Sequence, residues 1–225
     1  MLATPVYDSP DSSYVFAISK SREALSRAGI LSSYLLLSGG VHVDDNRNTI
    51  TKDFLESDCT DLVFLDADVS WQSQDLVKLC QYDLDVVGGV YPYRRKDPRN
   101  TSNKMPVRMK PGAEIVDGLL EVDGLPTGFL RIRRHVLETL AEDAGKFEKN
   151  GEYYPLIFER TVYDGQRMGG DINFCRKWQE EGGKLYASTE MRLGHIAKQV
   201  ITDSLGASMR VVGSFFSKPS RTLYW

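Results

Sequence analysis

Two aspartates that directly follow an apolar run are the residues of this sequence best suited to chemistry. Asp66 and Asp68 flank Ala67, and residues 61–65 before them read Asp-Leu-Val-Phe-Leu. An apolar run of this length is typical of a buried strand. Carboxylates at the carboxyl end of a central strand lie where open α/β sheets bind ligands, and such a pair can hold one Mg²⁺ or Mn²⁺ ion. Aspartate is also common in loops and helix caps, so the triplet alone leaves that interpretation open.

The elements that must position these aspartates alternate between strands and helices. Apolar runs with glycine stops predict strands, and apolar residues at helical spacing predict helices. The first expected strand is short: it ends near Ala3, and Pro5 breaks it. The other expected strands cover 30–37, 61–65, 85–90, 115–122 and 184–187. The expected helices begin near 12 and cover 45–56, 74–81, a stretch from a basic start at 131–134 to Leu140, and 172–181. This order predicts an α/β, Rossmann-like fold with a mostly parallel central sheet flanked by helices.

Length and composition fit one soluble α/β domain. Of the 225 residues, 41% are hydrophobic and 26% are charged, which are ordinary values for a globular protein. No apolar run approaches membrane-spanning length, and the N-terminus lacks the pattern of a secretory signal. The three cysteines have no metal-type spacing and indicate free thiols in a reducing compartment. We therefore expect the protein to act in the cytoplasm.

A basic segment interrupts the otherwise acidic chain. Residues 93–110 contain seven basic side chains and one acid, a net charge of +6, whereas the whole chain carries −3. Prolines at 98, 106 and 111 predict a long irregular loop, and such loops tend to be lids or binding loops. A local anionic partner explains this charge, and so does a plain solvated loop. We expect a single domain over 1–225 because no repeat or linker is visible.

Six short motifs occur in order along nearly the whole chain. They are Thr4-Pro5, Asn46-Arg47-Asn48, Asp66-Ala67-Asp68, Gly124-Leu125-Pro126-Thr127-Gly128-Phe129, Gly170-Asp171 with Asn173-Phe174-Cys175, and Arg192-Leu193-Gly194-His195-Ile196. In this order they resemble the GT-A fold glycosyltransferases, particularly small bacterial and phage-type members of the inverting, family-2-like group. Each motif is weak alone, and the set is specific. The resemblance implies transfer of a sugar from a nucleotide-diphosphate sugar, most commonly a UDP-sugar in this fold, to an acceptor hydroxyl.

The resemblance also implies roles for individual residues. Asp68 is the expected ligand of Mn²⁺ or Mg²⁺, Asp66 contacts the ribose or a metal-bound water, and His195 completes the metal site. Further nucleotide and donor contacts are expected at Thr4, Pro5, Arg47, Ala67 and Gly128. The expected parts of the domain are a nucleotide-sugar-binding half at 1–92, the basic loop at 93–112 and an acceptor and catalytic half at 113–225.

Asp171 is the expected catalytic base. Sugar transfer needs a carboxylate that deprotonates the acceptor hydroxyl and a cation that stabilises the departing diphosphate. Members of the group commonly carry Glu-Asp where this chain has Gly170-Asp171, so the first acid is missing. Asp164 and Glu190 are candidate substitutes for it. Inversion at the anomeric carbon follows if Asp171 acts in a single displacement.

Four more residues are candidate contacts to the diphosphate or the acceptor. Arg94 and Arg95 of the basic loop can supply counter-charge. The rings of Tyr91 and Trp71 can stack on a sugar or a base, and they are equally plausible as core residues.

The acceptor is expected to be a glycan, either lipid-linked or part of a polysaccharide. DNA with a hydroxymethylated base, as in phage-type DNA modification within the host cytoplasm, is the minority hypothesis. The basic loop and the cluster Arg131, Arg133 and Arg134 favour it, because cations bind DNA phosphates. The acidic pI of about 5.7 argues against it.

Two other functions share these features. A nucleotidyltransferase also uses two acids and Mg²⁺, but residues 4–13 contain no glycine for the phosphate loop that it usually needs. A non-catalytic module that binds a nucleotide or a sugar is compatible with the glycine at position 170. The aromatic-rich tail at 215–225 is expected to cover the active site or to make a contact with another molecule.

Overall fold

The computed structural model describes residues 1–40, 42–94 and 104–197. Three expectations fall outside the described residues. They concern Arg95, the part of the basic loop at 95–103, and the tail at 215–225.

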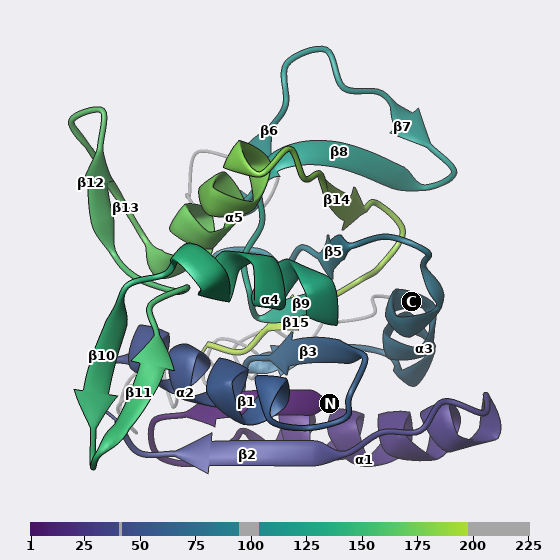
Figure 1. The fold of residues 1–225 in the computed structure, drawn as a ribbon. Coiled ribbons are helices and arrows are strands. Elements are labelled where there is room, and N and C mark those ends of the chain that lie inside the picture. Colours follow the sequence, from purple (N-terminus) through teal and green to yellow (C-terminus); the bar gives the residue numbers. More distant parts are fainter. Residues whose placement is uncertain (41, 95–103, 198–225) are drawn as a thin grey trace, which may run out of the picture.

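Within these residues the centre of the protein is a nine-stranded sheet (Figure 1). Its strands, in spatial order, are β2 (Tyr34–Ser38), β1 (Leu2–Val6), β3 (Asp61–Leu65), β9 (Phe129–Arg133), β5 (Val86–Gly89), β14 (Leu185–Ser188), β8 (Leu119–Gly124) and β6 (Arg108–Met109), with β7 (Ile115–Val116) also on β8. β1 pairs in parallel with β2 and β3, and β14 pairs in parallel with β5. β9 lies antiparallel between β3 and β5, and β8 lies antiparallel to β14. The expected α/β fold is confirmed, with a mixed central sheet.

Helices cover both faces of this sheet (Figure 1). On one face lie α2 (Val43–Leu55), α4 (Arg134–Asp143) and α5 (Gly170–Glu180), and on the other lie α1 (Ser12–Arg27) and α3 (Ser73–Gln81). Along β3, Leu62 and Phe64 belong to the first core, whereas Val63 and Leu65 belong to the second. Successive side chains of a strand point to opposite faces, so a strand covered on both faces is a continuous apolar run. This is the run that identified β3 in the sequence.

Among the described residues, three short strand pairs lie outside the main sheet. They are β10 (Lys146–Lys149) with β11 (Glu152–Pro155), β12 (Thr161–Tyr163) with β13 (Gln166–Met168), and β4 (Val69–Ser70) with β15 (Gly194–His195). The last pair directly follows the aspartates at the end of β3, and it therefore belongs to the site.

Several local expectations are wrong. The basic residues at 131–133 belong to β9, and α4 begins only at Arg134. Pro5 lies within β1, where it pairs with Leu37, and the pairing of β1 to β3 covers only Leu2 and Ala3. A proline is tolerated at a point where one side of a strand makes no ladder.

The segment expected as one strand at 115–122 is a hairpin. It turns at Asp117 and Gly118, with φ of 51° and 74°, before β8 continues to Gly124. The two positive φ values suit the tight turns that join antiparallel strands. Within the segment expected as an irregular loop, Arg108 and Met109 form the edge strand β6 on β8.

Candidate functional site

The aspartate pair lies at the carboxyl end of β3, where the chain leaves the sheet. The Asp66 N–H donates to the Gly128 carbonyl at 2.9 Å, which extends the β3–β9 pairing by one bond. The chain then enters β4, and β4 pairs with β15 so that His195 lies opposite Val69. This long-range strand pair brings His195 next to Asp68.

Asp66 is held by two side chains from neighbouring elements. Arg47 Nη2 of α2 lies 3.0 and 3.3 Å from the two Asp66 carboxylate oxygens, and the Tyr91 hydroxyl donates to Oδ2 at 3.4 Å. Burial, followed by the negative charge of Asp66, raises the pKa of Tyr91 well above its ordinary value, so the phenol keeps its proton and donates. Although burial acts to lower the pKa of Arg47, Asp66 and other nearby groups raise it. Asp66 is therefore a fixed carboxylate that anchors a buried cation.

Asp68 and His195 meet across the β4–β15 pair. Asp68 Oδ2 and His195 Nε2 are 3.7 Å apart. Arg94 bridges them, because its Nη2 forms an ion pair with Asp68 and its Nε donates to His195 Nε2 at 3.0 Å. The side chains of Asp68 and Arg94 are 32% and 52% exposed, so solvent reaches this bridge. A positive charge of the protein itself lies between the two expected metal-binding atoms.

The ring of His195 is oriented with Nε2 toward the site. Its Nδ1 lies 2.8 Å from the Pro92 carbonyl oxygen, and this acceptor favours the tautomer with the hydrogen on Nδ1. The ring also packs edge-on against Tyr91, with centroids 4.9 Å apart. Burial lowers the pKa of His195, and the charge of Arg94 acts in the same direction. The neutral ring therefore presents a lone pair on Nε2, as a metal ligand requires.

The spacing of Asp68 and His195 is compatible with one divalent cation, whose other ligands would come from phosphate and water. Two atoms that bind one cation at about 2.1 Å lie no more than about 4.2 Å apart, and the 3.7 Å between Asp68 Oδ2 and His195 Nε2 meets this limit. Within the described residues, no three His, Cys, Asp or Glu side chains gather into a metal site. Asp66 faces Arg47 instead. Sites of this kind take one or two protein carboxylates and add phosphate oxygens and water.

Gly128 is required by the packing around Asp66. A Cβ atom at this position would lie 2.6 Å from Asp66 Oδ2 and closer still to the Tyr91 hydroxyl. Neither group can move away cheaply, because Asp66 is bonded to Arg47 and Tyr91 is buried. The glycine expected to shape the donor pocket therefore also gives Tyr91 access to Asp66.

Asp171 is the second residue of α5, in its first turn. One of its oxygens accepts the Ile172 N–H at 2.8 Å. The charge of Asp171 contributes to the raised pKa of both Arg47 and Tyr91, so it belongs to the same electrostatic neighbourhood as Asp66.

Neither candidate substitute for the missing acid joins Asp171. Asp164 lies at the turn of the β12–β13 hairpin, with φ of 46°. Glu190 forms an ion pair with Lys78 of α3. The acid that does reach the start of α5 is one that the sequence did not single out, Asp44 of α2, whose carboxylate lies against Gly170. Its signal in the sequence is the i,i+3 spacing to Arg47 on one helix.

Other expected contacts belong to the core or to the backbone of the turn. Thr4 is fully buried, and its hydroxyl is hydrogen-bonded to that of Tyr14. Pro5 is buried in β1. Ala67 contributes its carbonyl, which accepts the Asp11 N–H at the start of α1 at 3.0 Å. Thr4 and Pro5 are therefore buried residues, and Ala67 joins the aspartate turn to the start of α1 through its backbone.

The two asparagines beside Arg47 hold loops around the site. Asn48 donates to the Phe158 carbonyl at 2.8 Å, and its side-chain oxygen accepts the N–H groups of Ile157 and Phe158 at 3.1 and 2.8 Å. Asn46 donates to the Gly39 carbonyl at 2.6 Å. Arg47 thus projects into the site from a helix turn that is fastened on both sides.

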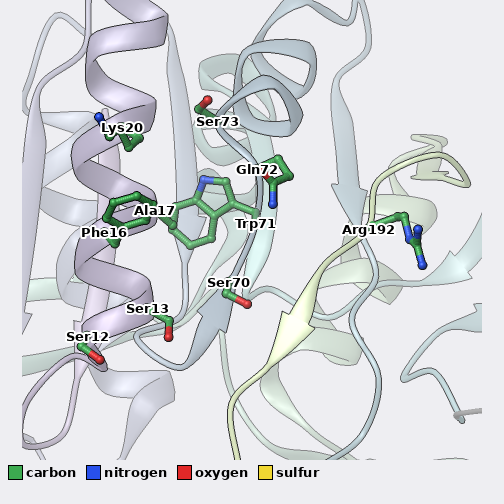
Figure 2. A pocket seen from close by; sticks show the side chains of 10 residues that line it. All are labelled: Ser12, Ser13, Phe16, Ala17, Lys20, Ser70, Trp71, Gln72, Ser73 and Arg192. Atoms are coloured by element: carbon green, nitrogen blue, oxygen red, sulfur yellow. The ribbon is translucent and has the colours of Figure 1, made fainter.

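A groove of about 590 Å³ lies between α1 and residues 70–73 (Figure 2). Its lining contains two cationic residues and no acid: Ser12, Ser13, Phe16, Ala17, Lys20, Ser70, Trp71, Gln72, Ser73 and Arg192. Phe16 is 67% exposed, whereas Trp71 is buried with its Nε1 donating to Ser21 at 2.8 Å. Of the two aromatic residues, Phe16 presents the more accessible ring to a ligand.

The basic cluster at 131–134 lies at the other end of the sheet. Because β9 is antiparallel to β3, its last residues lie beside the first residues of β3. Arg131 is bonded to Asp61 and to the carbonyls of Tyr82 and Leu84. Arg133 forms ion pairs with Asp83 and Asp85, and Arg134 donates to carbonyls at the end of α2. These arginines are therefore bonded within the protein, at the end of β3 opposite to Asp66 and Asp68.

No helix among the described residues is long and apolar enough to cross a membrane.

Comparison with known proteins places the fold. No protein-family model matches the chain, and no curated protein sequence matches it either. The crystal structure of A197 from STIV has a TM-score of 0.50 at 23% identity, over 90% of this chain and 97% of that chain. The structure of GalNAc-T7 with UDP, GalNAc and Mn²⁺ has a TM-score of 0.52 at 14% identity, over 94% of this chain and 48% of that chain. The inositol-1-phosphate CTP transferase from T. maritima has a TM-score of 0.46 at 8% identity. The first two comparisons establish that this chain has the GT-A type of α/β fold.

Proposed function

We propose that the protein is a glycosyltransferase that moves a sugar from a nucleotide-diphosphate sugar, a UDP-sugar in the first instance, to an acceptor hydroxyl in the presence of Mn²⁺ or Mg²⁺. The observation that carries this proposal is the meeting of Asp68, His195 Nε2 and Arg94 at the carboxyl end of β3. Open α/β sheets bind their ligands at this edge. The GT-A type of fold supports the proposal, since GalNAc-T7, which shares it, was crystallised with UDP, GalNAc and Mn²⁺.

Asp68 and His195 are the residues that would hold the divalent cation. A cation bound there stabilises the negative charge of the departing diphosphate as a Lewis acid. Arg94, which contacts both Asp68 and His195, would add a counter-charge for the diphosphate, since a guanidinium forms paired hydrogen bonds with phosphate. Arg47, anchored on Asp66, adds a second positive charge at this edge. Thr4, Pro5 and Ala67 would support the nucleotide through the shape of the surrounding backbone.

Asp171 would act as the base toward the acceptor. A carboxylate at this position accepts the proton of the attacking hydroxyl, and such general-base assistance is worth about 10²- to 10⁴-fold in rate. Its oxygen that is bonded to the Ile172 N–H is held in place, which leaves the other oxygen for the acceptor. Attack from the face opposite to the leaving diphosphate would invert the anomeric centre.

A glycan is the acceptor that we favour. The groove between α1 and residues 70–73 is lined by serine hydroxyls, Gln72 and the exposed ring of Phe16. Pockets of roughly 300–1,000 Å³ accommodate small ligands, and exposed rings and hydroxyls suit the apolar faces and hydroxyls of sugars. The DNA hypothesis loses three of its cations, because Arg131, Arg133 and Arg134 are paired at the opposite end of the sheet.

Thermal denaturation with a panel of UDP, GDP, CMP and dTDP, each with and without Mn²⁺, tests the proposal. A ligand at a hundred times its dissociation constant adds roughly 2.7 kcal/mol of stability. We expect a Mn²⁺-dependent shift with one nucleotide, UDP first, and loss of that shift in Asp68→Asn.

Asp61→Asn is the matched control, since Asp61 lies at the opposite end of the same strand and binds Arg131. This variant should lower the unfolding temperature and keep the nucleotide shift. No shift with any nucleotide, or an equal shift in Asp68→Asn, would contradict the proposed donor site.

A further inference from the structure

A buried acid on α2 is not accounted for by the proposed reaction. Asp44 is 8% exposed, although a buried carboxylate is costly unless it is paired. Arg160 Nε lies 3.1 Å from Asp44 Oδ2, and Arg47 Nη1 lies 3.8 Å from Oδ1. Arg47 is therefore held between two carboxylates, Asp44 on one side and Asp66 on the other.

The carboxylate of Asp44 occupies the space beside Gly170. A Cβ atom at position 170 would lie 2.8 Å from Asp44 Cγ and 3.3 Å from the Glu159 nitrogen. Carbon atoms do not approach this closely, so an acid at position 44 and a side chain at position 170 exclude each other. The backbone does not require a glycine here, because Gly170 is not among the glycines with positive φ. The glycine therefore makes room for Asp44.

The carboxylate of Asp44 lies about as far from position 170 as the carboxylate of a glutamate at that position would lie. In glutamate the carboxylate carbon lies about 2.5 Å from its own Cβ, across two C–C bonds of about 1.5 Å. Asp44 Cγ lies 2.8 Å from the Cβ position of residue 170. A glutamate at 170 could place its charge where Asp44 now places its own, next to the proposed base Asp171.

We infer that Asp44 is a positioning residue whose carboxylate takes the place of an acidic side chain at position 170. Its negative charge at the first turn of α5 favours the helix start, where the helix dipole is positive. Through its ion pair with Arg47, Asp44 also keeps the guanidinium of Arg47 directed at Asp66. Both effects maintain the geometry of the site, and the inference rests on the proposed function.

Moving the carboxylate from α2 to α5 tests this inference. The variants are Asp44→Gly, Gly170→Glu and the double variant that carries both changes. We expect Asp44→Gly to lower kcat at least 30-fold, with less than a three-fold change in the KM for the donor. Gly170→Glu should also lower kcat, because two carboxylates then compete for one space. The double variant should recover kcat to within about five-fold of the wild type.

Two further variants separate charge from shape. Asp44→Asn keeps the shape and removes the charge, so its kcat should fall as in Asp44→Gly while its folding changes less. Asp45→Gly places the same glycine one residue further along α2 at an exposed position, and it should keep kcat within about two-fold. Wild-type turnover in Asp44→Asn, or a double variant no better than the single ones, would overturn the inference.

Denaturant unfolding gives a measurement independent of activity. The proteins compared are the wild type, Asp44→Gly, Gly170→Glu and the double variant. The double variant should have an unfolding midpoint closer to the wild type than either single variant, since coupled residues in contact are not additive. If the changes in the unfolding midpoint of the two single variants add up in the double variant, the inference that one carboxylate replaces the other is overturned. Coupled midpoints without recovery of kcat would reduce Asp44 to a stabilising residue. If the wild type neither binds nor turns over any nucleotide sugar, the proposed function fails, and the unfolding data still decide the structural part of the inference.

Discussion

The two ends of β3 use the same residue types for different purposes. β3 begins with Asp61 and is followed by Asp66, and each aspartate is paired with a buried arginine. At the amino end, Arg131 is also bonded to two backbone carbonyls, at 2.7 and 2.6 Å. At the carboxyl end, Arg47 is bonded to carboxylates, and a second cation, Arg94, bridges Asp68 and His195.

The difference lies in what the cations are bonded to. Arg131 is buried and is bonded to two backbone carbonyls that the fold holds in place, so it serves stability. The groups around Arg94 are side chains that a metal ion or a phosphate can also bind, and the side chain of Arg94 is half exposed. An ion pair with exchangeable, partly hydrated partners can give way to a ligand. We therefore expect variants at the carboxyl end to change function and variants at the amino end to change stability.

The largest effect is expected from Asp171→Asn. This change removes the proposed base and preserves its size, so turnover should fall by about 10²- to 10⁴-fold. Binding of the nucleotide, measured by calorimetry with Mn²⁺ present, should stay within a few-fold of the wild type. Normal turnover in this variant would exclude Asp171 as the base and would return attention to a non-catalytic binding module.

The next largest effect is expected from Arg131→Met at the amino end. The change leaves Asp61 and the carbonyls of Tyr82 and Leu84 without their buried partner. Breaking such a network costs about 2–4 kcal/mol of unfolding free energy, measurable by urea denaturation. The Mn²⁺-dependent nucleotide shift should remain. A lost shift with unchanged stability would mean that the two ends of β3 are not separable in this way.

The contrast between the two ends could be predicted only in part from the sequence. The carboxyl end was identified because an apolar run stops abruptly at two acids, and this is local information. At the amino end, the sequence around Arg131 and Arg133 predicts the start of a helix, and this prediction is wrong. They belong to the antiparallel strand β9, and its neighbours β3 and β5 lie far away in the sequence.

Contacts between distant segments account for most of what the sequence left open. The motif around His195 resembles a known pattern and predicts a role for that residue, but it does not predict that β15 pairs with β4. The contact of Asp44 with Gly170 has no local signature, because it joins the first turns of two helices far apart in the chain. Trp71 and Tyr91 were equally plausible as core or ligand contacts, and both are buried. A ring is a large apolar filler first, and spacing does not tell which neighbour it will meet.

The smallest effect, and the most specific test of the comparison, is expected from Arg94→Ala. Without its guanidinium, Asp68 and His195 lose a competitor for the cation, so Mn²⁺ alone should bind more tightly. An exposed ion pair is worth about 0.2–1 kcal/mol, which predicts an increase of about 1.4- to five-fold, measurable from the free Mn²⁺ signal in electron paramagnetic resonance. UDP should bind less tightly to the Mn²⁺-saturated variant, because the diphosphate loses a counter-charge. Arg133→Ala removes a partly exposed arginine paired at the amino end and should change neither affinity. Only a residue that both blocks the metal and binds the phosphate moves the two affinities in opposite directions. Equal losses of both would make Arg94 a simple structural partner of Asp68.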